Sequence, residues 1–276
     1  DRTQHVLQVG AQTGPIFLIH RDNSAIDRLV AVARGGSPLY DFTAPDGIRH
    51  TVWRVTAAQE LVQAFARIPV AYVADGHHRA AAAARAGQDR RAANPRHRGD
   101  EEYNWFLAVL FPASHLQVLA YNRCVVDLNG LEAASFLKAV RERFRVTEGA
   151  AARPAAPRQV SMCLGGRWYG LTWEPDAQAD PVSALDVSVL QNRLLGPVLG
   201  IADPRNNARI EYVGGFQSVA EVQRRVESGR AAVGFSVFPT TVAELMAISD
   251  AGQIMPPKST WFEPKLRSGL FVHALD

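Results

Sequence analysis

The chain has 276 residues, 47% of them hydrophobic and 21% charged, and this globular composition excludes a wholly disordered protein. Its length suits two domains or one large domain. The formal net charge of +3 is too small to indicate a nucleic-acid partner by itself. No apolar run approaches the roughly 18 residues of a membrane span, and no secretory signal follows Asp1.

The first part of the chain alternates strands and helices. Apolar periodicity, β-branched residues and capping residues predict, in chain order, a strand at residues 15–20, a helix at 24–34 capped by Ser24, a strand at 49–55, a helix capped by Thr56, a strand at 70–73, and a helix at 77–86 that ends at Gly87. A polar, arginine-rich loop is expected over residues 88–100.

Two long strands, at residues 104–111 and 117–125, open the next part. They are followed by a helix at 131–144, a hairpin with strands at 160–164 and 168–173, helices at 184–195, 219–228 and 241–251, and further strands at 209–213 and 232–237. A shift to Ala- and Pro-rich composition at 148–158 indicates an interdomain linker or a long excursion. We therefore expect a mixed α/β (α+β) fold with helices flanking mixed sheets, one region at 1–147 and a second at 148–276.

One stretch carries the clearest chemistry: Asp75-Gly76-His77-His78-Arg79, between an apolar strand and an alanine-rich helix. A helix start leaves backbone N–H groups unpaired at the positive end of the helix dipole, which favours phosphate there. Gly76 allows an anion to approach closely. His77, His78 and Arg79 can donate hydrogen bonds to phosphate oxygens, Arg79 through a bidentate fork. Asp75 would repel that phosphate unless Mg²⁺ lies between them, so the pattern predicts a site for a metal-bound nucleoside polyphosphate.

Two simpler explanations of the same residues stay open. Asp75 would also serve as an ordinary N-cap of the helix. Adjacent histidines can bind Zn²⁺, although His77 and His78 would point about 100° apart on a helix and no third ligand at zinc-site spacing lies nearby.

A second candidate site is Met255-Pro256-Pro257-Lys258-Ser259-Thr260, followed by Lys265. Only three of the 30 basic side chains are lysines, so a lysine here suggests a need for a compact ammonium. Consecutive prolines hold the backbone extended, and a Lys-Ser-Thr triplet offers a cation and two hydroxyls to a phosphate or carboxylate. An ordinary surface loop is the alternative.

The remaining candidates are weaker. Cys124 and Cys163 have no motif partner, which fits a reducing cytoplasm and gives no support to a nucleophilic thiol. The arginines between residues 85 and 98 indicate a solvated face, with docking of nucleic acid or a triphosphate as the alternative.

The segment DGHHRAAAAA resembles the DGHHR box of the domain-of-unknown-function family 1015, a bacterial and archaeal family that resembles the ParB/sulfiredoxin superfamily. Further stretches are similar to the same family: AQT with PIFLIH (11–20), PLYDFT (38–43), EYNWFLAVLF (102–111), LNG (128–130), GIADPR (200–205), YVGG (212–215) and MPPKSTWFEPKLRSGLFVH (255–273). The resemblance implies a ParB-like nucleotide-binding core in which His77, His78 and Arg79 hold phosphates, and its relatives include CTP hydrolases and a free-serine kinase.

Members of this family begin with a further N-terminal segment. In the kinase-like relatives, a glutamate of that segment is the expected general base. Asp1 corresponds to a point inside the usual family sequence, and the segment does not occur in these 276 residues, so we assign no general base.

The leading hypothesis is a nucleotide-dependent phosphotransferase that uses Mg²⁺ and ATP, or another nucleoside triphosphate, to phosphorylate a small hydroxylated acceptor. Free L-serine is the acceptor that the resemblance implies. The site residues are, for catalysis, Asp75, His77, His78 and Arg79, with Asp75 as metal ligand, and, for nucleotide phosphates, Gly76, His77, His78, Arg79, Lys258, Ser259, Thr260 and Lys265. The alternatives are a nucleotide-gated CTP- or ATP-binding protein without turnover, associated with DNA as ParB relatives are, and a structural protein that binds no nucleotide. A homodimer is compatible with each alternative, and a membrane partner is not expected.

Overall fold

The computed structural model describes residues 2–215, 217 and 219–276, and the chain divides into two compact units. Unit 1 comprises Asp1–His115 and Leu266–Asp276, and unit 2 comprises Leu116–Lys265. These divisions differ from the expected boundary at 147/148. Unit 1 is therefore discontinuous in sequence, because the chain returns to it after completing unit 2.

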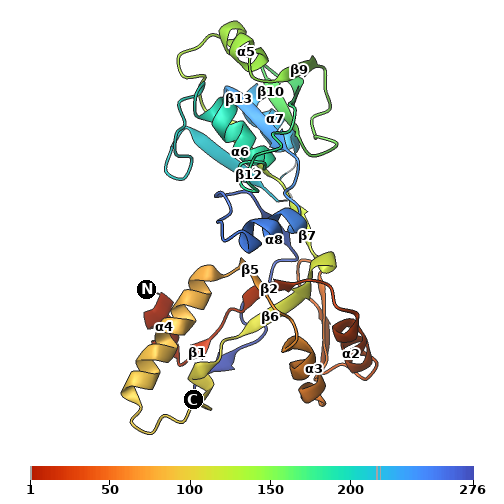
Figure 1. The fold of residues 1–276 in the computed structure, drawn as a ribbon, viewed down its shortest axis with the longest axis vertical. Coiled ribbons are helices and arrows are strands. Elements are labelled where there is room, and N and C mark those ends of the chain that lie inside the picture. Colours follow the sequence, from red (N-terminus) through yellow and green to blue (C-terminus); the bar gives the residue numbers. More distant parts are fainter. Residues whose placement is uncertain (1, 216, 218) are drawn as a thin grey trace. The chain divides into compact units, whose positions relative to one another are not determined.

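Unit 1 combines short sheets with helices (Figure 1). Its elements are α1 (Arg2–Val9), β1 (Ala11–Gln12), β2 (Ile16–His20), α2 (Ser24–Arg34), β3 (Tyr40–Thr43), β4 (Arg49–Val52), α3 (Ala58–Phe65), β5 (Tyr72–Asp75), α4 (His77–Ala93), η1 (Glu102–Asn104), β6 (Ala108–Pro112), η2 (Ala113–His115) and β15 (His273–Ala274).

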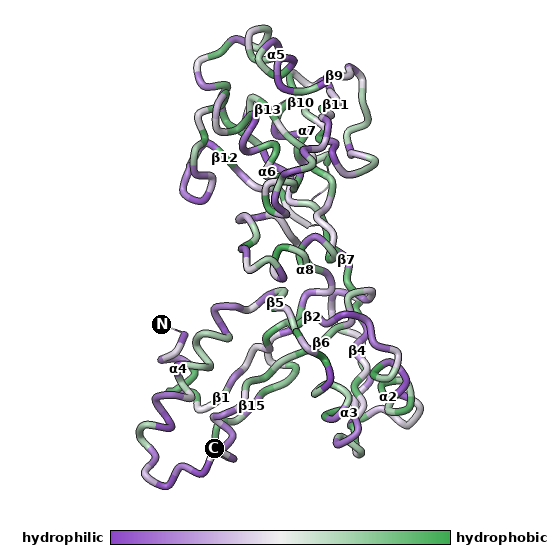
Figure 2. The backbone as a smooth tube through the Cα atoms, viewed as in Figure 1, coloured by the Kyte–Doolittle hydropathy of each residue, from purple (hydrophilic) through white to green (hydrophobic). Residues whose placement is uncertain are grey.

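The central sheet of unit 1 has the strand order β5-β2-β6. Strand β2 runs antiparallel to β5 and parallel to β6, and its apolar residues Ile16, Phe17 and Ile19 are buried. A second pairing joins distant parts of the sequence: β1 lies antiparallel to β15, with Ala11 opposite Ala274 (Figure 2). The remaining strands, β3 and β4, form an antiparallel hairpin.

Unit 2 is built on one antiparallel sheet with the order β12-β8-β13-β10-β11-β9. Its elements are β7 (Gln117–Leu119), β8 (Tyr121–Val125), α5 (Ala133–Arg141), β9 (Arg145–Glu148), β10 (Gln159–Leu164), β11 (Arg167–Thr172), α6 (Asp186–Leu190), η3 (Gln191–Leu195), β12 (Ile210–Gly214), α7 (Val219–Glu227), β13 (Val233–Val237), α8 (Val242–Asp250) and β14 (Trp261–Glu263). Strand β14 pairs with β7 outside this sheet.

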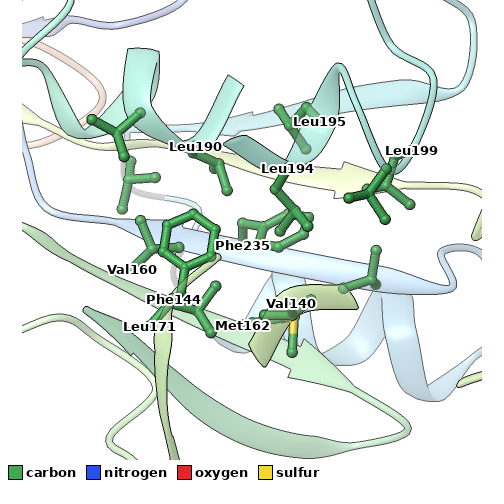
Figure 3. Packing of buried hydrophobic residues seen from close by; sticks show 14 of the residues in the cluster. Val140, Phe144, Val160, Met162, Leu171, Leu190, Leu194, Leu195, Leu199 and Phe235 are labelled. Carbon is green, nitrogen blue, oxygen red and sulfur yellow. The ribbon is translucent and has the colours of Figure 1, made fainter. Parts of the chain in front are cut away.

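Alternate residues of the unit 2 strands face opposite sides of the sheet. On one side, Met162 and Phe235 pack with Leu194 of η3 and other apolar residues of α5 and α6 (Figure 3). On the other side, Cys163 packs with Val222 of α7. Both faces of the sheet are therefore covered, and burial of a side chain such as Phe235 contributes about 1.5–3 kcal/mol.

The mixed α/β prediction is confirmed, and so are most predicted elements of unit 2. The predicted hairpin is β10 and β11, with Gly165 and Gly166 at positive φ in its turn. The helix predicted at 241–251 is α8, and Thr241 is its N-cap rather than its first helical residue. The segment 149–158 connects β9 and β10 of one sheet, so it is the long excursion rather than a linker between the units. In the described residues, no helix is long and apolar enough to cross a bilayer.

Several predicted bounds in unit 1 are wrong. Helix α4 continues through Gly87 to Ala93, and it takes up part of the expected loop at 88–100. A Cβ atom at Gly87 would lie 2.7 Å from the carbonyl oxygen of Tyr103, so this glycine makes room for a neighbouring backbone and does not end the helix. The strand expected at 104–111 is observed as β6, because residue 104 ends the 3₁₀ turn η1 and residues 105–107 form no regular secondary structure.

The predicted helix caps also differ. In α2 the cap is Asn23, whose side chain accepts a hydrogen bond from the Ala25 amide at 3.0 Å, rather than Ser24. In α3 the N-cap is Ala57, with no side-chain cap, rather than Thr56. Patterns of capping residues fix a helix start to within one or two positions only.

Candidate functional site

A single glycine makes the turn between β5 and α4. Gly76 adopts φ +92° and ψ +22°, in the left-handed region where a residue with a Cβ atom is strained. The first amide of α4 to reach a helical carbonyl is that of Ala80, which donates to the Gly76 oxygen at 2.8 Å. The amides of residues 77–79 therefore precede the first helical hydrogen bond, and such amides are donors for an anion.

The N-cap explanation of Asp75 is wrong. Asp75 is the last residue of β5, and Gly76, which has no side chain to cap the helix, occupies the N-cap position of α4. The Asp75 carboxylate instead accepts a hydrogen bond from Arg79, one turn into the helix, with an Oδ2–Nη2 distance of 3.3 Å. Its side chain is half exposed, so the carboxylate stays accessible at the mouth of the turn.

The Arg79 guanidinium is held in place from two sides. Its Nε atom donates to the carbonyl oxygen of Pro15 at 3.0 Å, just before β2, while Nη2 contacts Asp75. These contacts leave donors on Nη1 and Nη2 free for a further acceptor. Arg79 is 31% exposed, so those donors can reach a ligand without rebuilding the turn.

Two glycines give the Arg79 side chain its space. A Cβ atom at Gly76 would lie 2.9 Å from Arg79 Nη2, and a Cβ atom at Gly14 would lie 3.3 Å from Arg79 Cδ. Gly76 is thus required twice, for its backbone conformation and for the position of the guanidinium.

His77 and His78 lie at the entrance of the turn. Both are exposed, and their ring centroids are 4.1 Å apart with 49° between the ring planes. His78 also lines a shallow cavity of about 360 Å³ with Arg2 and Arg85. Across residues 2–215, 217 and 219–276, there is no group of three or more His, Cys, Asp or Glu side chains that could hold a metal ion.

A deeper cavity of about 200 Å³ lies beside Arg79 within unit 1. Helix α1, which packs against α4, contributes Arg2 and His5 to its wall, and the C-terminal segment contributes Ser268. No sequence motif points to these three residues. The three-residue spacing of Arg2 and His5 places them on one face of α1, but no local pattern says that this helix meets α4.

We name residues 75–79 the DGHHR turn. The only carboxylate in this turn that could bind Mg²⁺ is that of Asp75. Mg²⁺ is commonly held by one or two carboxylates together with substrate phosphates. Asp75 alone fits such an ion only when a phosphate supplies further oxygen ligands, so the residues are compatible with metal that arrives with a nucleotide.

The predicted residues of the second motif lie in unit 2. Lys258 is exposed and adopts φ +53°, with its Nζ atom 5.5 Å from the centroid of the Tyr121 ring. Lys265 lies over Trp261 in the same way, at 4.5 Å. Both ammonium groups therefore rest on aromatic faces, where cation–π attraction holds them.

The two hydroxyl residues of that motif differ in accessibility. Ser259 is buried, its hydroxyl donates to the Pro256 carbonyl, and its own carbonyl accepts from Thr240 Oγ1 at 3.2 Å. Thr260 is half-buried. The Ser259 hydroxyl thus has an internal partner, and the assignment of Lys258, Ser259, Thr260 and Lys265 to phosphate stays a prediction.

The DGHHR turn has the features of a phosphate-binding helix start: free amides, an anchored guanidinium and exposed imidazoles. The chain carrying it belongs to the protein family of unknown function DUF1015, whose family model matches residues 1–188. The family predicted from the motifs is thereby confirmed. No curated protein matches the chain.

Several solved structures are similar to the chain at low identity. A free serine kinase in complex with AMP is 13% identical, with a TM-score of 0.42, and the match covers 94% of this chain and 77% of that one. A conserved hypothetical protein from Pyrococcus furiosus is 14% identical, with a TM-score of 0.41 and coverage of 96% and 83%. SbnI with a C-terminal truncation, from Staphylococcus aureus, is 10% identical, with a TM-score of 0.42 and coverage of 97% and 88%.

Proposed function

We propose that the protein is a nucleotide-dependent phosphotransferase that binds the phosphates of a nucleoside triphosphate at the DGHHR turn and phosphorylates a small hydroxylated acceptor. One observation carries the proposal: the Arg79 guanidinium is fixed over a left-handed glycine at the uncapped start of a 17-residue helix. A helix start with free amides and a positioned arginine offers several hydrogen-bond donors to phosphate oxygens.

In the proposed reaction, the acceptor oxygen forms a bond to the terminal phosphorus, the bond to the bridging oxygen breaks, and nucleoside diphosphate leaves. Such transfer depends mainly on positioning and charge neutralisation. The amides after Gly76, together with Arg79, would hold the phosphates, and His77 and His78 would donate further hydrogen bonds. Mg²⁺ held by Asp75 would offset the charge on the phosphates, and no residue is assigned to accept the hydroxyl proton. Free L-serine is the first acceptor to test.

The binding step is tested by titrating the full chain with ATP, with and without Mg²⁺. Arg79→Lys keeps the charge but loses the planar fork, so we expect affinity to fall roughly 10- to 100-fold, as the loss of a charged hydrogen bond worth about 1.5–3 kcal/mol requires. Arg91→Lys is the matched control, because Arg91 is exposed near the other end of the same helix. Equal affinity for both variants would contradict the assignment of phosphate to Arg79.

The transfer step is tested with labelled ATP and a panel of hydroxylated amino acids. Asp75→Asn should lower turnover and its Mg²⁺ dependence more than nucleotide affinity, because the amide keeps an acceptor for Arg79 but loses the charge that attracts the metal. Nucleotide binding without transfer to any acceptor would favour the nucleotide-gated binding protein instead. The absence of both activities would leave the proposal without support.

A further inference from the structure

Unit 2 contains a buried arginine that the DGHHR turn does not use. Arg123 lies on β8 and is 4% exposed. Its Nη1 atom donates to the Tyr121 carbonyl at 2.6 Å, and Nη2 donates to the Lys258 carbonyl at 3.3 Å. Within the described part of the chain, no aspartate or glutamate forms an ion pair with this guanidinium. A buried charge is costly unless a partner compensates it.

The charge of Arg123 is not removed by deprotonation of the arginine, and it is not neutralised by a negatively charged Tyr212. Burial lowers the pKa of Arg123 to about 10, which still leaves the guanidinium charged at neutral pH. The ring of Tyr212 packs 5.6 Å from the guanidinium carbon, but burial raises the pKa of that phenol, so it remains neutral. The Arg123 guanidinium therefore keeps its positive charge, and Tyr212, the titratable side chain packed against it, supplies no negative charge.

Arg123 faces a cavity of about 350 Å³ that lies entirely within unit 2. Ser188 of α6 and Gln191 and Asn192 of η3 line one part of it, and Pro256 and Pro257 line another. This volume is at the lower end of the range for small-molecule sites, and paired prolines make a stiff wall. The cavity thus combines a buried cation with hydroxyl and amide groups.

One carboxylate also lines the cavity, and it is already paired. Asp203 binds Arg205 through two contacts, Oδ1 to Nε at 2.9 Å and Oδ2 to Nη2 at 3.0 Å. These hydrogen bonds lower the pKa of Asp203, so the pair is ionised and carries no net charge. Its presence does not neutralise Arg123, which remains the unmatched charge of the cavity.

We propose that this cavity binds a small organic anion whose carboxylate or phosphoryl oxygens accept hydrogen bonds from Arg123. A guanidinium has five N–H donors, and two of those on Arg123 are used by backbone carbonyls. The three that remain match the planar array of oxygens that both anionic groups present. The bound anion supplies the counter-charge that the surrounding residues lack.

The test uses the full chain carrying Arg79→Gln, which weakens anion binding at the DGHHR turn, so that the change caused by Arg123→Gln reports on the cavity of unit 2. Titration calorimetry at constant ionic strength compares malonate with inorganic phosphate, which separates a carboxylate ligand from a phosphoryl ligand. We expect saturable binding of at least one probe, weakened on the order of 10-fold or more by Arg123→Gln. Arg167→Gln, at an exposed arginine of β11, is the charge control and should bind as before.

A second variant keeps the test decisive if Arg123→Gln does not fold. Asn192→Leu changes an exposed side chain that lines the cavity, so it leaves the core intact while it removes an amide and narrows the space. It should weaken the same probe several-fold, and the Arg123 Nε–H resonance should shift during titration of the unmodified cavity. No saturable binding of either probe, or binding that both cavity variants leave unchanged, would overturn the proposal.

Discussion

Replacing Gly76 with alanine tests whether the turn exists to position Arg79. At φ +92° an alanine is strained by about 1–2 kcal/mol, which predicts a fall in Tm of roughly 2–4 °C for each kcal/mol. The new Cβ atom would also lie 2.9–3.1 Å from three atoms of the Arg79 guanidinium. Because that group is the end of a flexible side chain, it would move away and lose its hydrogen bond to Pro15.

Two measurements separate strain from displacement of Arg79. Thermal unfolding gives the stability cost, and ATP titration gives the affinity, which we expect to fall roughly 10-fold or more once the guanidinium moves. Gly47→Ala is the matched control: Gly47 has φ +82°, and no described atom lies within 4 Å of its ideal Cβ position. A similar Tm loss in both variants with unchanged ATP affinity in Gly76→Ala would refute the reasoning.

Two further predictions concern titratable groups of unit 2. Burial raises the pKa of Asp186 from its ordinary value of 3.8 to about 6, so the protonated carboxyl stabilises the fold fully below about pH 4, and this stabilisation is lost as the pH rises through 6. In urea unfolding from pH 4 to 7, we therefore expect the free energy of unfolding of Asp186→Asn to rise relative to that of the parent protein. Stabilities that change in parallel across this pH range would contradict the prediction. Burial also raises the pKa of the Cys124 and Cys163 thiols to about 11, so we expect an aromatic disulfide reagent at pH 8 to label both thiols rapidly only after the protein is denatured. Rapid labelling of the native protein would show that these thiols are not buried.

The DGHHR turn could be predicted because its signals are local. An apolar strand, a glycine and an alanine-rich helix follow one another within about 20 residues, and each has its own periodicity or backbone preference. The contact of Arg79 with Pro15 could not be predicted in this way, since it depends on the pairing of β5 with β2 across more than 50 residues of sequence. Sequence alone therefore identifies the residues of the turn but not the way the guanidinium is held.

Arg123 shows the opposite case. A single arginine within the strand YNRCV is compatible with an edge strand, a solvent-exposed face or an ion pair elsewhere. Its burial results from β12 and β13 on either side of β8 and from the loop that follows α8, all of which come at least 80 residues later in the chain. The available signal is one charged residue in a strand whose other residues are uncharged, and it gives no indication of the partner.

The pairing of β1 with β15 sets an order of events during synthesis on the ribosome. Unit 2 is contiguous, so all its strands emerge before β15, and its sheet can close while unit 1 still lacks a partner for Ala11 and Gln12. At about 5–20 residues per second, the roughly 260 residues between β1 and β15 take about 13–50 s to translate. During that interval the nascent chain exposes an unpaired strand edge next to the pocket that Arg79 lines, so unit 1 completes its strand pairing after unit 2 has formed.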